Sequence, residues 1–307
     1  MVPAEDRSGP PFRIGTRGSA LAQIQAGRVK QRLDATFPSL NCELVVISTQ
    51  GDRDKQTPLT VIGGQGVFAK ELQFALLENR IDCAVHSLKD LPSILPDGLV
   101  LAAVMERDDP HDVFISPHGC SLDDLPTGAR VGTSSRRRMA QVLHARPDIE
   151  IIELRGNVDT RVSKVMNGSP ERYDGAVLAA AGIRRMGYQE TITQTLDLDR
   201  FTPAPGQAAL GVECRADDET ARRIFDVLSD PETSMTTAAE RAFLREFGGG
   251  CTMPIGAHGT LDDGVVTLRV MVASEDLRHV QIDRLTAEPE HIQDVAAVAA
   301  RAMRSGR

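Results

Sequence analysis

The sequence lacks tryptophan, has two tyrosines, and draws only 4% of its 307 residues from the aromatic types. Proteins that bind single-stranded nucleic acid stack the bases on aromatic side chains along a basic groove. The formal net charge of -8 also repels nucleic acid and anionic membranes. The composition therefore argues against nucleic-acid and membrane partners.

Cysteine is limited to five positions, an odd number without CxxC spacing: Cys42, Cys83, Cys120, Cys214 and Cys251. This pattern argues against a disulfide framework and against a metal site such as zinc. Cys42, Cys83 and Cys214 sit in or beside apolar strand patterns, which predicts buried free thiols. Cys251 instead follows three glycines in GGGCTMPIGAH (248–258), where the thiol has room for a bulky group. It is expected to be a nucleophile or an attachment point, with a buried structural thiol as the alternative.

Long apolar runs are also missing. No segment approaches the roughly 18 apolar residues of a membrane span, and the first eleven residues lack the apolar stretch of a signal peptide. A cytoplasmic protein is therefore expected, and a monomer is favoured. The chain exceeds the usual size of one hydrophobic core, which predicts two or three domains with at least one cleft.

Strand-like and helix-like segments alternate along the chain, as in a parallel α/β sheet. Strands are expected at 12–15, 43–49 and 81–87, and Ser19 is placed to cap the first helix. The pattern begins again at 129–133, where Gly-Thr again precedes a helix. Two similar α/β lobes are the simplest explanation.

The later segments complete the expected organisation. Strands 149–154 and 176–182 continue the second lobe, and the strand at 208–214 is expected to return to the sheet of the first lobe. Strands 265–274 and 279–288, between two helices, predict a small α+β domain. The expected domains are residues 12–105 plus 207–226, residues 106–206, and residues 227–307.

Basic and hydroxyl side chains gather where predicted strands end, the place where open α/β sheets bind ligands. They are Arg17, Ser19, His86, Ser87, Lys89, Asp90, Thr133, Ser134, Ser135, Arg136, Arg137, Arg138, Arg155, Asn157, Arg184 and Arg185. A guanidinium group matches a carboxylate through two hydrogen bonds. The sequence has no GxxxxGK[ST] phosphate loop and no GxGxxG after a strand. These positions predict a cleft for a small molecule with several carboxylates.

The Lys89-Asp90 pair allows more than one interpretation. Asp90 is the one carboxylate among cleft cations, which would keep it ionised and able to steady a cation or move a proton. Lys89 could form a Schiff base, as in a pyridoxal-phosphate enzyme. A solvated surface pair is the third alternative.

Distinctive motifs occur from one end of the chain to the other: GTRGSALAQ, GGQGVFAKEL, IDCAVHSLKDLP, VGTSSRRR, ELRGNVDTR, PAPGQAAL and GGGCTMPIGAH. Together they resemble the porphobilinogen deaminase family. The resemblance runs from about Phe12 to the C-terminus. It implies a transferase that condenses four porphobilinogen molecules head to tail, with loss of ammonia, into hydroxymethylbilane. It also implies a dipyrromethane cofactor attached by a thioether, here to Cys251, and a product that passes to uroporphyrinogen-III synthase.

The resemblance also assigns residues. Asp90 matches the catalytic aspartate, which assists ammonia loss and stabilises positive pyrrole nitrogens. Residues that match binders of acetate and propionate groups, or that would support them, are Arg17, Ser19, Lys89, Thr133, Ser135, Arg137, Arg138, Arg155, Asn157, Arg161, Arg185 and Gln207. Phe68 matches the aromatic residue beside the pyrrole site. Gln50, Val61 and Gln65 replace residues that are basic in many relatives, which predicts a less basic loop.

The implied fold is two lobes resembling periplasmic binding proteins around a central cleft, with a small α+β C-terminal domain. A rival of the same architecture is a polycarboxylate-binding protein without catalysis.

Overall fold

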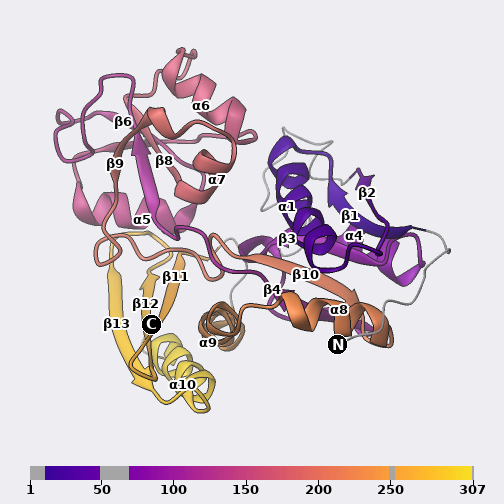
Figure 1. Cartoon of the computed structure of the whole chain (residues 1–307). Coiled ribbons are helices and arrows are strands. Elements are labelled where there is room, and N and C mark those ends of the chain that lie inside the picture. The colour runs from indigo at the N-terminus through magenta and orange to yellow at the C-terminus, as the bar shows by residue number, and fades with distance from the viewer. Residues whose placement is uncertain (1–10, 49–68, 249–252, 306–307) are drawn as a thin grey trace. The chain divides into compact units, whose positions relative to one another are not determined.

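The structure is a computed structural model that describes residues 11–48, 69–248 and 253–305. The chain forms two compact units (Figure 1). Unit 1 comprises residues 1–106 and 209–234, and unit 2 comprises residues 107–208 and 235–307. Among the described residues, none of the helices is long and apolar enough to cross a membrane.

Unit 1 is built on a five-stranded sheet in the order β2-β1-β3-β10-β4. Its strands are β1 (Phe12–Arg17), β2 (Cys42–Ile47), β3 (Cys83–Ser87), β4 (Leu99–Val104) and β10 (Leu210–Arg215). β1 pairs in parallel with β2 and β3, whereas β10 is antiparallel to both β3 and β4. The strand expected to return to the first lobe therefore lies inside that sheet.

Helices cover the sheet of unit 1: α1 (Ala20–Thr36), α4 (Lys70–Leu77) and α8 (Glu219–Leu228), with a 3₁₀ turn at η1 (Leu88–Asp90). Apolar residues recur in α1 at the spacing of one helix face, and three of them, Ala26, Val29 and Leu33, are fully buried against β1. Ser19 caps this helix through its Oγ, which accepts a hydrogen bond from Ala22 N at 3.3 Å.

The first part of unit 2 is a second lobe with the same pattern of strands, in the order β7-β6-β8-β5-β9. Its strands are β5 (Asp112–Ile115), β6 (Arg130–Gly132), β7 (Glu150–Ile152), β8 (Gly175–Ala179) and β9 (Ile192–Thr195). Its helices are α5 (Arg136–Ala145), α6 (Val158–Met166) and α7 (Ala180–Arg185), with a 3₁₀ turn at η2 (Gln189–Thr191). In each lobe four strands run in one direction, and the fourth strand in the order, β10 or β5, runs antiparallel to its two neighbours.

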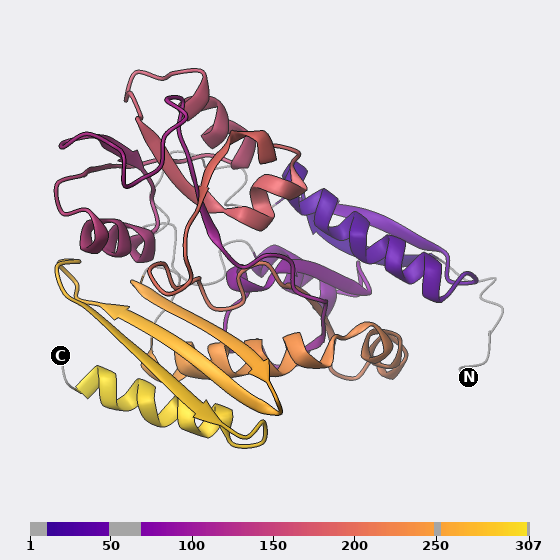
Figure 2. The ribbon, with the colours of Figure 1, turned by 60° about the vertical axis from the view of Figure 1, so that its left-hand side comes forward.

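The rest of unit 2 is a small α+β domain. An antiparallel sheet of β11 (Ile255–Asp262), β12 (Val265–Ala273) and β13 (Val280–Ala287) has α10 (Ile292–Ser305) along one face (Figure 2). Helix α9 (Pro231–Phe247), which begins at the end of unit 1, packs on the same face. Val270 of β12 points to these helices, and the next residue, Met271, packs on α5 of the second lobe, as the alternation of a strand requires. The expected α/β class, with two similar lobes and an α+β domain, is confirmed.

Some predicted elements differ from the observed ones. The strand expected at 176–182 ends at Ala179, and the helix α7 begins at Ala180, because an apolar run does not by itself separate strand from helix. The polar run ERDDPHD (106–112) has the composition of a linker, but its last residue, Asp112, begins the buried strand β5. The short β9 and the long β11 were not predicted.

The cysteines of the strands are buried and free, as expected. Burial raises the pKa of the Cys42 and Cys214 thiols to about 11 and that of Cys83 well above its usual value. A thiol that stays protonated at neutral pH is a poor nucleophile. These three side chains therefore fill the core.

Candidate functional site

In unit 1 the predicted site residues meet at one edge of the sheet. β1 ends at Arg17, and its parallel neighbour β3 ends at Ser87, followed at once by Lys89 and Asp90. The carboxyl ends of parallel neighbours lie at the same edge, so the Arg17-Ser19 turn and the Lys89-Asp90 turn are adjacent. Gln25 of α1 ties the two ends together, because its Nε2 donates to Ser87 Oγ at 2.8 Å.

Buried leucines fix the turn that holds Asp90. Leu88 and Leu91 are 1% and 3% exposed, while Lys89 and Asp90 between them are half-buried. Leu88 N donates to Ala209 O at 3.0 Å, which anchors the turn to the segment before β10. A Cβ on Gly211 would lie 3.0 Å from Leu88 Cδ1, so glycine leaves the space that this leucine fills. The Asp90 carboxylate is thus presented by a rigid turn.

His86, at the end of the same strand, belongs to the interior instead. Its Nε2 lies 3.1 Å from Glu213 Oε2 of β10, and both side chains are almost fully buried. Glu213 Oε1 accepts a hydrogen bond from Gln73 Nε2 of α4 at 2.9 Å. Glu213 of β10 therefore contacts both His86 of β3 and Gln73 of α4 inside the unit.

In unit 2 the corresponding edge holds the ends of β6 and β7, which are parallel. Ser135 caps α5, and its Oγ accepts from Arg138 N at 3.5 Å. Ser135 N is bonded in turn to Thr133 Oγ1 at 3.2 Å. The two hydroxyl groups expected at the site thus shape the start of α5, the helix that contains Arg137 and Arg138.

Arg137 and Arg138 are buried around one carboxylate, Asp112 at the start of β5. Arg137 Nη1 donates to Asp112 Oδ2 at 2.8 Å, and Arg138 donates to Oδ1 from Nε at 3.1 Å and from Nη2 at 2.8 Å. Burial alone would raise the pKa of Asp112, but the two guanidinium groups hold it well below its usual value. Burial lowers the pKa of Arg137, and the neighbouring Arg138 charge lowers it further.

The other predicted arginines of this unit also contact acids of the chain. Arg155 Nε donates to Glu153 Oε1 at 2.7 Å, and Arg185 Nε donates to Asp108 Oδ2 at 2.8 Å. Arg185 is the more rigid of the two, since its side chain is 4% exposed and its Nη2 also donates to Ala208 O at 2.6 Å. Guanidinium groups held in this way lose little conformational freedom when a further anion arrives.

The remaining predicted residues take different places. Gln207 is buried, and its Nε2 donates to Asp112 Oδ1 at 2.9 Å, which adds it to the arginine cluster. Asn157 precedes α6 and is exposed, and Arg161 lies within α6 and is half-buried. Five of the residues singled out in the sequence lie outside the described ranges: Gln50, Val61, Gln65, Phe68 and Cys251.

Asp112 is the important residue that sequence reasoning missed. It is the last residue of ERDDPHD, a run whose polar composition indicates a junction between domains and not a strand. The four residues DVFI form a strand too short to show a period. The available signal was an aspartate directly before three large apolar residues, a position where a buried strand begins.

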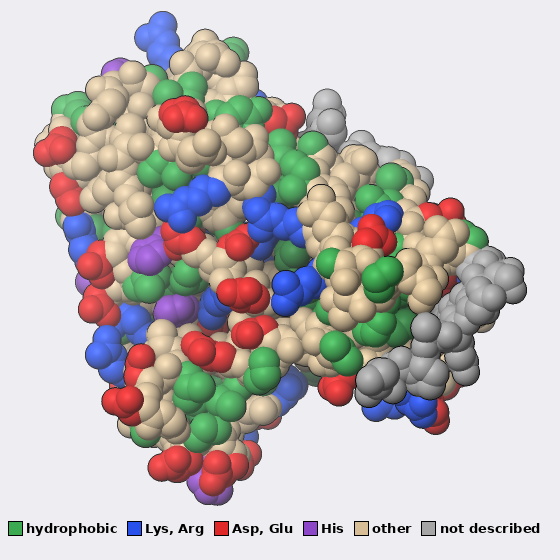
Figure 3. Space-filling model, in the orientation of Figure 1, with side chains coloured by type: hydrophobic (Ala, Val, Ile, Leu, Met, Phe, Trp, Pro, Cys, Tyr) green, Lys and Arg blue, Asp and Glu red, His purple; other side chains and the backbone are tan. Residues whose placement is uncertain are grey.

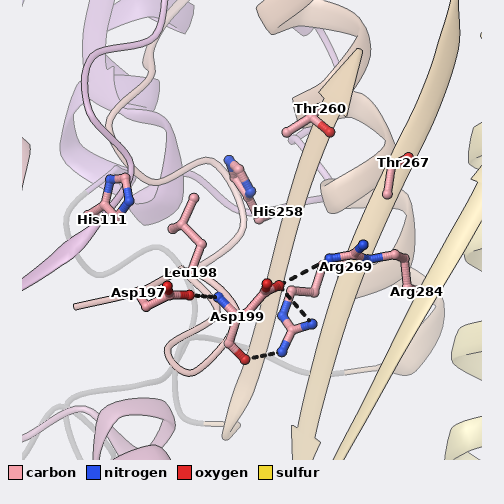
Figure 4. Close-up of a pocket in the computed structure, with 9 residues that line it drawn as sticks. All are labelled: His111, Asp197, Leu198, Asp199, His258, Thr260, Thr267, Arg269 and Arg284. Atoms are coloured by element: carbon pink, nitrogen blue, oxygen red, sulfur yellow. Dashed lines mark hydrogen bonds and ion pairs between the residues drawn. The ribbon is translucent and has the colours of Figure 1, made fainter. Parts of the chain in front are cut away.

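A pocket of about 350 Å³ lies elsewhere in unit 2, between the second lobe and the three-stranded sheet (Figure 4). Asp199 lies between two arginines there, with its Oδ1 3.0 Å from Arg284 Nη2 and 3.3 Å from Arg269 Nη1. His258, 8% exposed, points into the pocket beside His111. None of the predicted site residues with a described position lines this pocket.

Acidic and basic side chains are mixed over the visible surface of the molecule (Figure 3).

Comparisons with known proteins identify relatives over most of the chain. The family model "Porphobilinogen deaminase, dipyromethane cofactor binding domain" matches residues 12–223, and "Porphobilinogen deaminase, C-terminal domain" matches residues 234–304. A "Porphobilinogen deaminase" of Syntrophobacter fumaroxidans is 50% identical over 265 residues, which cover 86% of this chain and 85% of the relative. One of Syntrophus aciditrophicus is 46% identical over 295 residues, covering 96% and 95%.

Proposed function

The chain belongs to the porphobilinogen deaminase family, and we propose that Asp90 of unit 1 and the strand-end arginines of unit 2 act on porphobilinogen. The chain is a transferase of porphyrin biosynthesis that joins four porphobilinogen molecules, with loss of ammonia, into hydroxymethylbilane. It uses a dipyrromethane cofactor. The rival interpretation, a polycarboxylate-binding protein without catalysis, is not supported by these relatives.

The rigid turn of Asp90 is the observation that supports its catalytic role most directly. The buried Leu88 and Leu91 on either side hold the backbone of this turn, and with it the half-buried Asp90, at the sheet edge. Held there, it can steady positive charge on a pyrrole nitrogen and move a proton as the amino group of the substrate leaves. Lys89 and Arg17 at the same edge supply positive charge for the acid groups of the substrate.

Arg137, Arg138, Arg155, Arg161 and Arg185 would receive the acetate and propionate groups. Each porphobilinogen brings two carboxylates, so the growing chain gains negative charge at every addition. The dipyrromethane is built from the same units, and the donor set of unit 2 suits it for the same reason. When bound, the dipyrromethane supplies the pyrrole end to which the first substrate is joined. We propose that Cys251 is its point of attachment.

Intact mass spectrometry tests this assignment. The mass of the purified protein should exceed the 33.2 kDa of the polypeptide by the mass of two pyrrole units. Incubation with porphobilinogen should add the mass of further units. Cys251→Ser should lack the extra mass, while Cys120→Ser, which removes another thiol of the same unit, should keep it. A normal cofactor mass in Cys251→Ser would contradict the attachment.

The chain is further proposed to work in the cytoplasm as a monomer and to release its product to uroporphyrinogen-III synthase. The free thiols of Cys42, Cys83, Cys120 and Cys214 fit a reducing compartment. Purified enzyme supplied with porphobilinogen alone should release hydroxymethylbilane into solution. Product that stays bound until the synthase is added would contradict free release.

A further inference from the structure

Asp112 gathers four side-chain hydrogen bonds on its two oxygens. Oδ1 accepts from Arg138 Nε, Arg138 Nη2 and Gln207 Nε2, and Oδ2 accepts from Arg137 Nη1. The side chain of Asp112 is 0% exposed, and those of Arg137 and Arg138 are 4% and 8% exposed. One carboxylate thus fixes the orientation of two guanidinium groups and one amide.

The backbone holds this carboxylate in place. Asp112 pairs with Ala179 of β8, and its carbonyl oxygen accepts from Leu196 N at 3.0 Å on the other side. β5 is an inner strand of its sheet, flanked by β8 and β9. Because a central strand cannot shift without breaking both ladders, Asp112 is a fixed support and cannot be displaced by an arriving anion.

The cluster is not neutral, since two guanidinium groups share one carboxylate. Each guanidinium has five N–H donors. In the part of the chain that the structure describes, each makes only two hydrogen bonds, with Arg137 Nη1 also donating to Thr202 O at 2.6 Å. A buried pair that serves stability alone is expected to be balanced, because an uncompensated buried charge is costly. The surplus positive charge and the unused donors indicate a second, external anion.

We infer that Asp112 is a positioning residue for substrate binding: it holds Arg137 and Arg138 in the one orientation in which their remaining N–H groups receive a carboxylate of the growing pyrrole chain. The inference rests on the proposed function, in which these two arginines bind acetate or propionate groups. Asp112 itself touches no substrate. It acts through the guanidinium groups that it orients and neutralises by one charge.

A double-mutant cycle on the purified holoenzyme tests this role. KM and kcat for porphobilinogen are measured for the wild type, Asp112→Asn, Arg138→Gln and the double variant. Asp112→Asn should raise KM about tenfold when Arg138 is present and less than about twofold when Arg138 is glutamine, because coupled residues are not additive. An equal effect in both backgrounds, or none, overturns the inference.

Two controls separate positioning from loss of stability. Leu122→Ala removes a fully buried side chain of the same lobe and should lower the melting temperature while KM stays near the wild-type value. Arg138→Lys keeps the charge but loses the two-pronged contact with Asp112, so KM should rise about as much as in Arg138→Gln. This variant answers the question even where Asp112→Asn does not fold, since a wild-type KM in Arg138→Lys overturns the inference.

A second measurement needs no turnover. Succinate, a plain dicarboxylate, should raise the melting temperature of the wild type more than that of Asp112→Asn. Equal shifts in the two proteins contradict the inference. If the wild type does not consume porphobilinogen, both the proposed function and this inference are wrong. If the enzyme is active but the effects of the Asp112 and Arg138 substitutions on KM are additive, only the positioning role is wrong.

Discussion

Arg107 and Glu240 form a buried ion pair in unit 2, with Arg107 Nη1 2.6 Å from Glu240 Oε1 and Nη2 3.3 Å from Oε2. The carboxylate is 0% exposed and also accepts hydrogen bonds from Gly206 N at 2.6 Å and Gly259 N at 2.8 Å. One side chain of α9 therefore ties together the start of the second lobe, the segment before β10 and the strand β11.

Glu240→Ala should destabilise the protein strongly. The substitution leaves the Arg107 charge and two backbone N–H groups buried without their acceptor, which costs about 3–5 kcal/mol for a buried pair. Thermal melting with calorimetry measures the loss. Glu246→Ala is the matched control on the same helix, because its pair with Arg301 is partly exposed and contributes at most about 1 kcal/mol. Similar losses in the two variants would contradict the importance given to Glu240.

His258 should make stability depend on pH. Burial, together with the positive charges of Arg107 and His111, lowers the pKa of its imidazole to about 4, although Glu240 acts in the opposite direction. As the pH falls, the unfolded chain therefore takes up the proton first, near pH 6.5, and stability is lost progressively down to about pH 4. At pH 5 the loss from this group is about 2 kcal/mol relative to neutral pH.

The measurement for His258 is the difference in stability between pH 7.5 and pH 5. His258→Gln should reduce this difference by about 2 kcal/mol. His279→Gln, at an exposed histidine of the same domain, should leave it as in the wild type. A pH dependence that survives in His258→Gln would assign the effect to other groups.

Asp90→Asn should remove turnover and preserve the fold. The amide keeps the size of the side chain between Leu88 and Leu91 but loses the negative charge, so kcat should fall about 10²- to 10⁴-fold. The release of ammonia from porphobilinogen measures the rate, and intact mass shows whether the cofactor is still present. Asp97→Asn, at an exposed aspartate of the same unit, should keep a normal rate. A rate near normal in Asp90→Asn would take the catalytic role from this residue.

Two glycine-to-alanine substitutions should change the stability of the protein in opposite directions. A Cβ on Gly175 of β8 would lie 2.1 Å from the Phe114 ring and 2.8 Å from Ile115 O, so Gly175→Ala should cost about 1–3 kcal/mol. Gly27, inside α1, has no neighbouring atom within 4 Å of such a Cβ. Gly27→Ala should therefore stabilise the protein by about 0.5–1 kcal/mol through helix propensity. Melting temperatures of both variants decide whether these glycines differ as stated.

Local patterns were the predictable part of the fold. The first helix follows from its period and from Ser19 as its cap, and both are interactions between residues a few positions apart. β5 and β9 were missed because each has only four residues and owes its strand geometry to partners far away in the chain. The boundary at Ala180 was missed because AVLAAAG is apolar throughout, which suits a buried strand and a buried helix equally.

For the site, too, the sequence predicted what depends on local order and not what depends on distant partners. Strand ends located the edge where Arg137 and Arg138 occur, because that argument needs only the order of elements. Their partner Asp112 lies 25 and 26 residues away in the sequence, on a strand that no local pattern indicated. Which acid pairs with which arginine is decided by tertiary packing, and a single sequence contains no local signal for it.

The place of β10 has a consequence for synthesis on the ribosome. This strand separates β3 from β4, yet it is encoded after the whole of the second lobe. When the first 106 residues have emerged from the ribosome, β3 and β4 both still lack β10, the strand that pairs with them. Their hydrogen-bonding edges stay unpaired until residue 215 has been made. The second lobe, whose strands are contiguous in the chain, can close before residue 215 is made. The first lobe should therefore become resistant to proteases only after the second lobe does.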